Sequence, residues 1–181
     1  MSAAEGRGTY KSWKVRYAPY LIAMCLAFVM VMLVAPEVNE GDAMSPTIKD
    51  GQVLVVSKTT YSQKRGLPER DQLVILEKTY APKVSEDNII ARVAALPGET
   101  VKIKDGVVYV DGKEYVTENG IKGAEGDLKV KLKKNQVFLL CDNREEMIDS
   151  RNKGLGPVDM QGIKGNVILR VWPLSQFGGI D

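Results

Sequence analysis

The sequence contains no histidine and only two cysteines among its 181 residues. Without histidine, neither a Ser-His-Asp triad nor a Cys-His dyad can form, and no metal site is expected. Cys25 lies in a long apolar stretch and Cys141 in a run typical of a β-strand, so no disulfide between them is expected. Cys141 can act as a nucleophile only with an unusual base, and the simpler interpretation is a small buried residue. No organic cofactor is implied.

An excess of charge of one sign is also lacking, because 25 basic and 23 acidic residues leave a net charge of only +2. Lysines are interleaved with Asp and Glu instead of forming a basic stripe, so nucleic acid is not an expected partner. Lys129, Lys131 and Lys133 alternate with apolar residues, which indicates the solvated face of a strand.

One long apolar run interrupts this even distribution. Residues 17–35 carry no charge, and about twenty apolar residues are needed to cross a bilayer as a helix. Basic residues within 1–16 precede the run and acidic residues follow it, which predicts a cytoplasmic N-terminus and an extracytoplasmic part over 36–181. A cleaved signal peptide is the alternative, but no Ala-x-Ala site follows the run. The sequence therefore predicts a single-pass protein of the cytoplasmic membrane, with the lipid bilayer as a partner.

Beyond residue 51, short runs of β-branched and aliphatic residues are separated by turn residues. Asp105-Gly106 and Asp111-Gly112 each separate two such runs, which is a strong hairpin signal. No segment here shows a helical period over a dozen residues. The predicted fold is mainly β, an antiparallel sandwich or barrel with a small inserted β lobe at about 104–134.

Four blocks of sequence, in this order, resemble the type I signal peptidases. They are residues 41–47 (GDAMSPT), 71–74 (DQLV), 91–99 (ARVAALPGE) and 141–158, which contains CDNR and DSR. The resemblance covers nearly all of 36–181 and implies a signal-peptidase-like antiparallel β domain behind one N-terminal transmembrane helix. It also implies a serine endopeptidase that trims signal peptides, with serine as nucleophile and a buried lysine as general base.

The chain departs from the family at both residues of this serine–lysine dyad. Ala43 occupies the nucleophile position and Ala91 the general-base position, so no catalytic residue is intact. Met147 stands where many members have a supporting serine hydroxyl, and Cys141 stands where glycine is usual. Ser45 is the nearest hydroxyl, but a displacement of even about 1 Å can cost a hundredfold in rate. Ser45 is therefore interpreted as a turn residue.

Two explanations of the alanines stay open. A natural homologue without activity fits the further changes at Cys141 and Met147, and its expected function is to bind exported precursor proteins and assist surface-protein or pilus assembly. The alternative is a genuine type I signal peptidase, which cleaves after small residues, inactivated by replacement of its serine and lysine. A third possibility is a membrane-tethered β domain whose groove has closed.

The resemblance also assigns binding and structural residues. An extended substrate is expected to pair with the strand at 72–76. The residues expected at this groove are Met44, Pro46, Gln72 and Val74. The residues expected in a structural charged network are Arg92, Asp142, Asp149, Ser150 and Arg151. Near the C-terminus, Trp172 and Phe177 are expected at the membrane interface, with core packing of Trp172 as the alternative.

Overall fold

The computed structural model describes residues 13–58, 61, 64–84 and 87–180, in two units, Met1–Leu33 and Val34–Asp181. The first unit contains the only α-helix of these described residues, α1 (Trp13–Leu33). Among the described residues, no helix combines the length and the apolar character that crossing a membrane requires. The helix ends two residues before the predicted end of the apolar run, because Pro36 and its neighbours belong to a strand and proline does not continue a helix.

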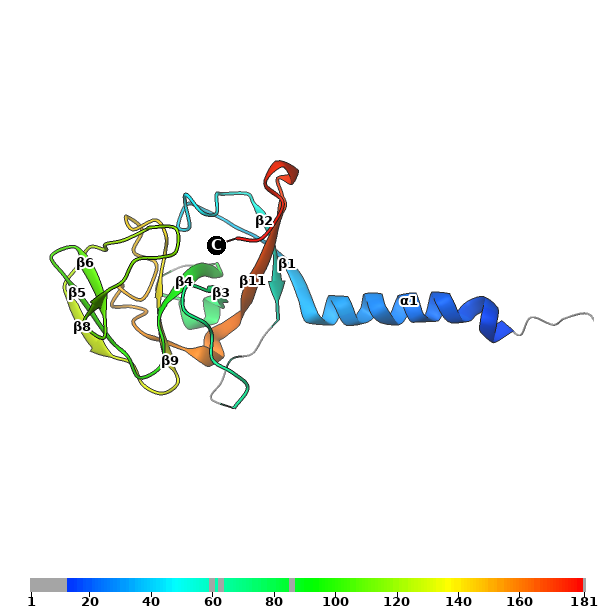
Figure 1. Cartoon of the computed structure of the whole chain (residues 1–181), viewed down its shortest axis with the longest axis horizontal. Coiled ribbons are helices and arrows are strands. Elements are labelled where there is room, and N and C mark those ends of the chain that lie inside the picture. Colours follow the sequence, from blue (N-terminus) through cyan, green and yellow to red (C-terminus); the bar gives the residue numbers. More distant parts are fainter. Residues whose placement is uncertain (1–12, 59–60, 62–63, 85–86, 181) are drawn as a thin grey trace, which may run out of the picture. The chain divides into compact units, whose positions relative to one another are not determined.

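The second unit, called the β domain below, is built around a seven-stranded sheet in which all paired neighbours are antiparallel (Figure 1). This arrangement confirms the prediction of a mainly β, antiparallel fold. The strands lie in the order β1 (Val34–Val38), β2 (Val53–Ser57), β11 (Ile163–Trp172), β3 (Leu73–Leu76), β4 (Ile89–Ala95), β9 (Gln136–Leu140) and β10 (Val158–Asp159). The described residues also form three short 3-10 helices, η1 (Lys78–Tyr80), η2 (Met160–Gly162) and η3 (Leu174–Gln176).

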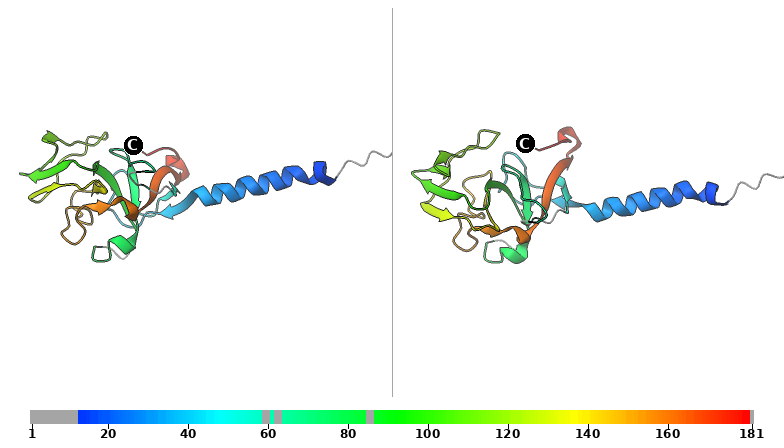
Figure 2. Two further views of the ribbon diagram at one scale, coloured as in Figure 1. Left: turned by 90° about the horizontal axis from the view of Figure 1, so that it is seen from below. Right: turned by 60° about the horizontal axis from the view of Figure 1, so that its bottom comes forward.

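A second, four-stranded sheet has the order β7 (Lys113–Glu114), β6 (Val107–Val110), β5 (Thr100–Lys104) and β8 (Leu128–Lys131). Figures 1 and 2 show it in green and yellow, at the end of the β domain away from β1 and β2. Asp105 and Gly106 both have positive φ, as the turn between β5 and β6 requires. The sheet begins at Thr100, four residues before the predicted start of the lobe, because β5 pairs with β8 from its first residue.

Buried side chains form three hydrophobic clusters. One joins the two sheets, with Ile103 of β5 and Leu140 of β9 among its members. The Ala91 cluster contains Val74, Leu76, Ala91, Val93 and Leu139, whereas the Met44 cluster contains Met44, Ile48, Ile75, Ile90 and Cys141. Successive residues of β3, and of β4 from Ile89 to Ala91, fall in different clusters because side chains alternate between the two faces of a sheet. All seven residues of β4 are therefore buried.

Candidate functional site

The segment between β1 and β2 carries the position expected for a nucleophile, and its shape is fixed by buried polar contacts. The buried Asn39 donates through Nδ2 to the carbonyls of Gly41 (3.0 Å) and Lys49 (3.1 Å). The Gly41 N–H donates to the Asp50 carboxylate at 2.8 Å. Gly41 has φ +82°, a conformation that favours glycine. These contacts close residues 39–50 into a tight loop.

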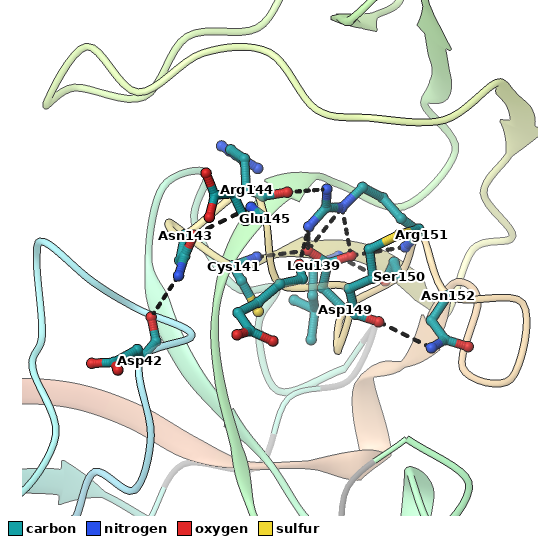
Figure 3. Close-up of polar contacts among 12 residues, drawn as sticks. Asp42, Leu139, Cys141, Asn143, Arg144, Glu145, Asp149, Ser150, Arg151 and Asn152 are labelled. Atoms are coloured by element: carbon teal, nitrogen blue, oxygen red, sulfur yellow. Dashed lines mark hydrogen bonds and ion pairs between the residues drawn. The ribbon is translucent and has the colours of Figure 1, made fainter.

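Ala43 is held against the segment that follows β9. Its carbonyl accepts a hydrogen bond from the Asn143 N–H at 2.9 Å, and the Asn143 side chain donates to the Asp42 carbonyl at 3.2 Å (Figure 3). Ala43 is only partly buried and packs against the Met44 cluster. The position therefore lies at the surface, on a rigid backbone.

A cleft of about 240 Å³ opens beside Ala43. Its walls combine apolar side chains with carboxylates and amides. The lining residues are Glu37, Val38, Asn39, Glu40, Ala43, Asp87, Asn88, Ile89, Ile90 and Ile148. None of these ten residues is a serine, threonine, cysteine, lysine or arginine, so the part of the cleft wall that the structure describes offers neither a hydroxyl or thiol nucleophile nor a basic amine.

The cleft lies where β4 has an unpaired edge. On one side, β3 pairs with β4 from Ile89 to Arg92, but on the other side β9 pairs with β4 only from Arg92 onward. Within the part of the chain that the structure describes, Ile89, Ile90 and Ala91 therefore have no strand partner on the β9 side. An extended peptide can add to such an edge by main-chain hydrogen bonds.

The far end of β1 reaches the start of β4 at this point. Asn88 donates through Nδ2 to the Glu37 carboxylate at 2.7 Å, and Lys164 of β11 donates to the same carboxylate at 3.1 Å. β1 is an edge strand, because it pairs with β2 alone. The cleft thus lies between two strand edges that a curled sheet brings together.

Arg92, which follows Ala91 in β4, forms a buried ion pair. Arg92 binds both oxygens of Asp142, at 2.9 Å through Nε and at 2.8 Å through a terminal nitrogen, and donates to the Asp71 carbonyl at 2.8 Å. The Thr47 hydroxyl donates to the same Asp142 carboxylate at 2.6 Å. Burial alone lowers the pKa of Arg92, but the bound Asp142 carboxylate outweighs burial and leaves the pKa raised. The pair links β4, the start of the 141–151 loop and the nucleophile-position loop.

A second network shapes the loop at 141–151 (Figure 3). The buried Asp149 carboxylate accepts hydrogen bonds from the Cys141 N–H at 2.9 Å and from the Arg151 guanidinium at 2.8 Å. Arg151 also donates to the carbonyls of Arg144 and Glu146. Ser150 Oγ accepts from the N–H of Leu139 in β9 at 3.0 Å. The predicted structural residues are thus divided between two adjacent networks.

The two alanine positions differ in their surroundings. Ala91 is only 1% exposed, lies opposite Val74 in the sheet and belongs to the Ala91 cluster. Ala43 borders the Met44 cluster and lines the cleft. Ile148 packs against both clusters. Met147, expected at the supporting position, is instead 41% exposed and does not line the cleft.

Cys141 is fully buried, as expected for a small packing residue. Burial raises the pKa of its thiol, and the nearby Asp149 carboxylate raises it further. Since the thiolate is the nucleophilic form, this environment disfavours the alternative role of Cys141 as a nucleophile. Ser45 lies in the turn after Ala43, where its N–H donates to the Asp42 carbonyl at 3.0 Å.

The predicted groove residues require correction. β3 is paired with β4 along its whole length, and Val74–Leu76 are also paired with β11, so these three residues cannot accept a peptide as a further strand. Val74 and Met44 are fully buried core residues, and the Gln72 side chain accepts a hydrogen bond from the Tyr61 hydroxyl. Pro46 is exposed and lies outside the cleft wall.

The residues that line the cleft had no clear sequence signal. Ile89 and Ile90 belong to a run of buried residues that shows no alternation, and Ile148 lies in a loop. Glu40 and Asp87 resemble any solvated acid in the sequence. These residues come together because of the way the sheet curls. The two-residue alternation of a strand sequence does not show how a sheet curls.

The C-terminal aromatic residues are exposed. Trp172 is 55% exposed, and Leu174 and Phe177 are more exposed still. Core packing of Trp172, one of the two alternatives, is therefore wrong. The interfacial position of Trp172 and Phe177 stays a prediction.

Comparison with known proteins identifies relatives over most of the chain. The family model described as signal peptidase, peptidase S26, matches residues 12–172. A signal peptidase I of Bacillus licheniformis is 33% identical over 176 residues, covering 89% of this chain and 89% of the relative. Signal peptidase IB of Staphylococcus aureus (strain COL) is 31% identical over 183 residues, covering 87% of this chain and 91% of the relative. A crystal structure of a signal peptidase I from Enterococcus faecalis V583 matches with a TM-score of 0.43 and 23% identity, over 55% of this chain and 95% of that chain.

Proposed function

The chain belongs to the signal peptidase family, peptidase S26, and from this membership we propose that it binds exported precursor proteins in its cleft without cleaving them. The observation that carries the proposal is the cleft beside Ala43, which adjoins the unpaired edge of Ile89–Ala91 yet has no nucleophile or amine among its described lining residues. An extended chain can lie along this edge, and the apolar wall suits small side chains. Such a protein would assist the assembly of surface proteins or pili as a chaperone.

The absence of cleavage is part of the proposal. The family's chemistry, as the resemblance gives it, needs a hydroxyl at position 43 and an amine at position 91, and both side chains are methyl groups here. Removing members of such a unit costs many orders of magnitude in rate, because each member works only with the others. The rigid loop and the two buried networks support retention of the binding geometry.

Filling the cleft tests the binding role. Ala43→Leu places a larger side chain at the cleft wall, so we expect it to weaken binding of an extended, alanine-rich precursor peptide by about tenfold or more. Fluorescence anisotropy with the full chain in detergent micelles measures the affinity, and gel analysis of the same samples measures cleavage. Gln161→Leu, an exposed position outside the cleft, is the control and should bind as the unchanged chain does. Equal affinities for both variants, or cleavage by the unchanged chain, would contradict the proposal.

A second candidate function is that of a genuine signal peptidase with inactivating substitutions. It is favoured by the identity with two curated signal peptidases along nearly their whole length. The two candidates differ in what reversion of the alanines should do. A scaffold inactivated only at the dyad should recover cleavage when serine and lysine are restored, whereas a site that has otherwise diverged should not.

We also propose that residues 17–33, the part of the apolar run that forms α1, anchor the chain in the cytoplasmic membrane, with the β domain outside. Support comes from the uncharged run, the basic residues before it and the exposed apolar side chains of α1, such as Leu26 and Phe28. Alkaline carbonate extraction is expected to leave the chain in the membrane pellet. The control variant Leu26→Arg with Val29→Arg should move to the supernatant, because arginine at a helix centre opposes insertion. Release of the unchanged chain would refute the anchor.

A further inference from the structure

The free edge of the four-stranded sheet carries exposed positive charge. β8 is the last strand of this sheet, and no described segment pairs with it on the side away from β5. The exposed Lys129 and Lys131 alternate along β8 with the half-buried Leu128 and Val130, which pack against the cluster that joins the two sheets. One face of this edge is therefore basic, and the other face is apolar and only partly covered.

The main chain of β8 is directed toward the same edge. The Leu132 N–H donates to the Glu99 carbonyl at 2.8 Å, so these two residues form a hydrogen-bonded pair between the chains that contain β8 and β5. Hydrogen-bonded and non-hydrogen-bonded pairs alternate along an antiparallel ladder, so Lys131 and Lys129 occupy the non-hydrogen-bonded positions. Their N–H and C=O groups therefore point away from β5. The edge offers two donors, two acceptors and two ammonium groups at the same residues.

The charges along this edge are not balanced within the sheet. Lys129 lies directly opposite Lys102 of β5, and like charges in this position destabilise a sheet. Lys104 forms an exposed ion pair with Asp105 at 3.8 Å, but no described carboxylate forms an ion pair with Lys102, Lys129 or Lys131. A second copy of the chain cannot relieve the repulsion by pairing through the same edge, because its own β8 would bring further lysines. The partner that suits the edge carries negative charge.

From this edge we propose that β8 binds an extended polypeptide segment in which acidic and apolar residues alternate, added to the sheet as a further antiparallel strand. Alternate side chains of a strand lie on the same face, so the carboxylates lie opposite Lys129 and Lys131 while the apolar side chains cover Leu128 and Val130. Main-chain hydrogen bonds supply affinity, and charge complementarity supplies the choice of partner. The site goes beyond the role proposed for the cleft and does not depend on it, because β8 belongs to the other sheet and does not line the cleft.

Peptides of about eight residues test the order of the side chains and the main-chain bonds separately. One peptide alternates glutamate and valine, and a second has the same composition with its glutamates together. With the full chain in uncharged detergent at about 20 mM salt, we expect the alternating peptide to bind about tenfold more tightly in fluorescence anisotropy. Methylation of its glutamate amide nitrogens should remove this advantage, because these N–H groups face β8. Methylation of its valine nitrogens, which face away from β8, should preserve it.

Variants of the chain assign the binding to β8. Lys129→Gln with Lys131→Gln is expected to weaken binding of the alternating peptide about tenfold. Lys113→Gln with Lys122→Gln removes two exposed charges elsewhere in the same lobe, so it is the matched control and should change the affinity less than twofold. In the unchanged chain, hydrogen exchange at the amides of Lys129 and Lys131 should slow when the peptide is bound, because these amides then donate to it.

Three results would overturn the inference. Equal affinity for the two peptide orders would mean that the lysines attract acidic chains without adding a strand. Equal weakening by both double variants, or no binding of the alternating peptide, would remove β8 as its site. Displacement by an excess of the alanine-rich precursor peptide would place the acidic peptide in the cleft instead. Failure of the alanine-rich peptide to bind, by contrast, would refute the role of the cleft alone.

Discussion

Asp142→Asn is expected to lower the free energy of unfolding by about 3–5 kcal/mol. The Asp142 side chain is 0% exposed and that of its partner Arg92 is 2% exposed. Asparagine keeps the size of the side chain but has no charge and only one oxygen, so the Arg92 guanidinium loses one of its two bonds and its counter-charge. A buried charge without its partner is among the most costly defects in a folded protein.

Denaturation of the full chain in detergent micelles, followed by tryptophan fluorescence, measures this loss. Asp105→Asn is the matched control, because the Lys104–Asp105 pair is exposed and 3.8 Å apart, and its effect should stay within about 0.5 kcal/mol. Arg92→Met with Asp142→Leu removes both charges and should cost less than Asp142→Asn alone. A loss for Asp142→Asn no larger than that of the control would show that water or another group satisfies Arg92.

The same substitution should also weaken peptide binding. The Thr47 hydroxyl donates to Asp142 at 2.6 Å, which ties the loop of Ala43 to β4 and to the 141–151 segment. Since the cleft has Ala43 on one wall and Ile90 on another, loosening this connection changes the distance between the walls. Stability and binding are thus coupled through one buried carboxylate.

Much of the β domain could be predicted from local pattern. The alternation of Val101, Lys102, Ile103 and Lys104 gives one buried and one solvated face, and the Asp-Gly pair that follows sets the hairpin turn. The sequence blocks identified the family, which the comparisons confirm. Local period, turn chemistry and motif order are all properties of short stretches, so they can be read without the tertiary structure.

The cleft could not be predicted in this way, because it depends on which strand edges remain unpaired. The strand at 72–76 was expected to receive the peptide, yet β3 lies in the interior of the sheet. The four residues of β3 do not show which strands pair with it on either side. Val34–Val38 was assigned in part to the apolar run, although it forms the edge strand β1 that borders the cleft. Pro36 was a signal for this boundary, since proline is tolerated at sheet edges.

The other large effect concerns the position expected for the general base. Ala91→Lys is expected to lower the free energy of unfolding at pH 7 by about 4 kcal/mol beyond the loss in Ala91→Met, a control of similar length without charge. Ala91 is 1% exposed and lies among apolar side chains, so the longer side chain of either variant lowers stability by overpacking the core. Only lysine also brings an amine that must be buried. Burial of this kind lowers the pKa of a lysine by about 3–5 units from its usual value near 10.4.

The sign of the pH dependence follows from this shift. In the folded variant the introduced amine is neutral at pH 7, whereas in the unfolded chain it is protonated, so the unfolded state binds more protons and stability rises with pH. The difference between Ala91→Lys and Ala91→Met should therefore be small near pH 10.4 and grow as pH falls toward the lowered pKa of the folded state. Denaturation curves of both variants at about pH 7 and about pH 10 measure it. A pH-independent difference would mean that the amine reaches water.

The location of that amine decides between the two candidate functions. If the introduced lysine is buried and neutral at pH 7, it can serve as a base for a serine at position 43, and Ala43→Ser with Ala91→Lys is expected to cleave a precursor that has small residues before the cut site. Ile148 packs against both the Ala91 cluster and the Met44 cluster, which Ala43 borders, so we expect its side chain to separate such an amine from position 43. Ile148→Ala in the same background should then increase cleavage by removing this obstacle. Recovery of cleavage would favour a genuine peptidase inactivated at the dyad. If the triple variant binds the peptide but does not cleave it, the result would favour a binding protein whose site has diverged beyond the dyad.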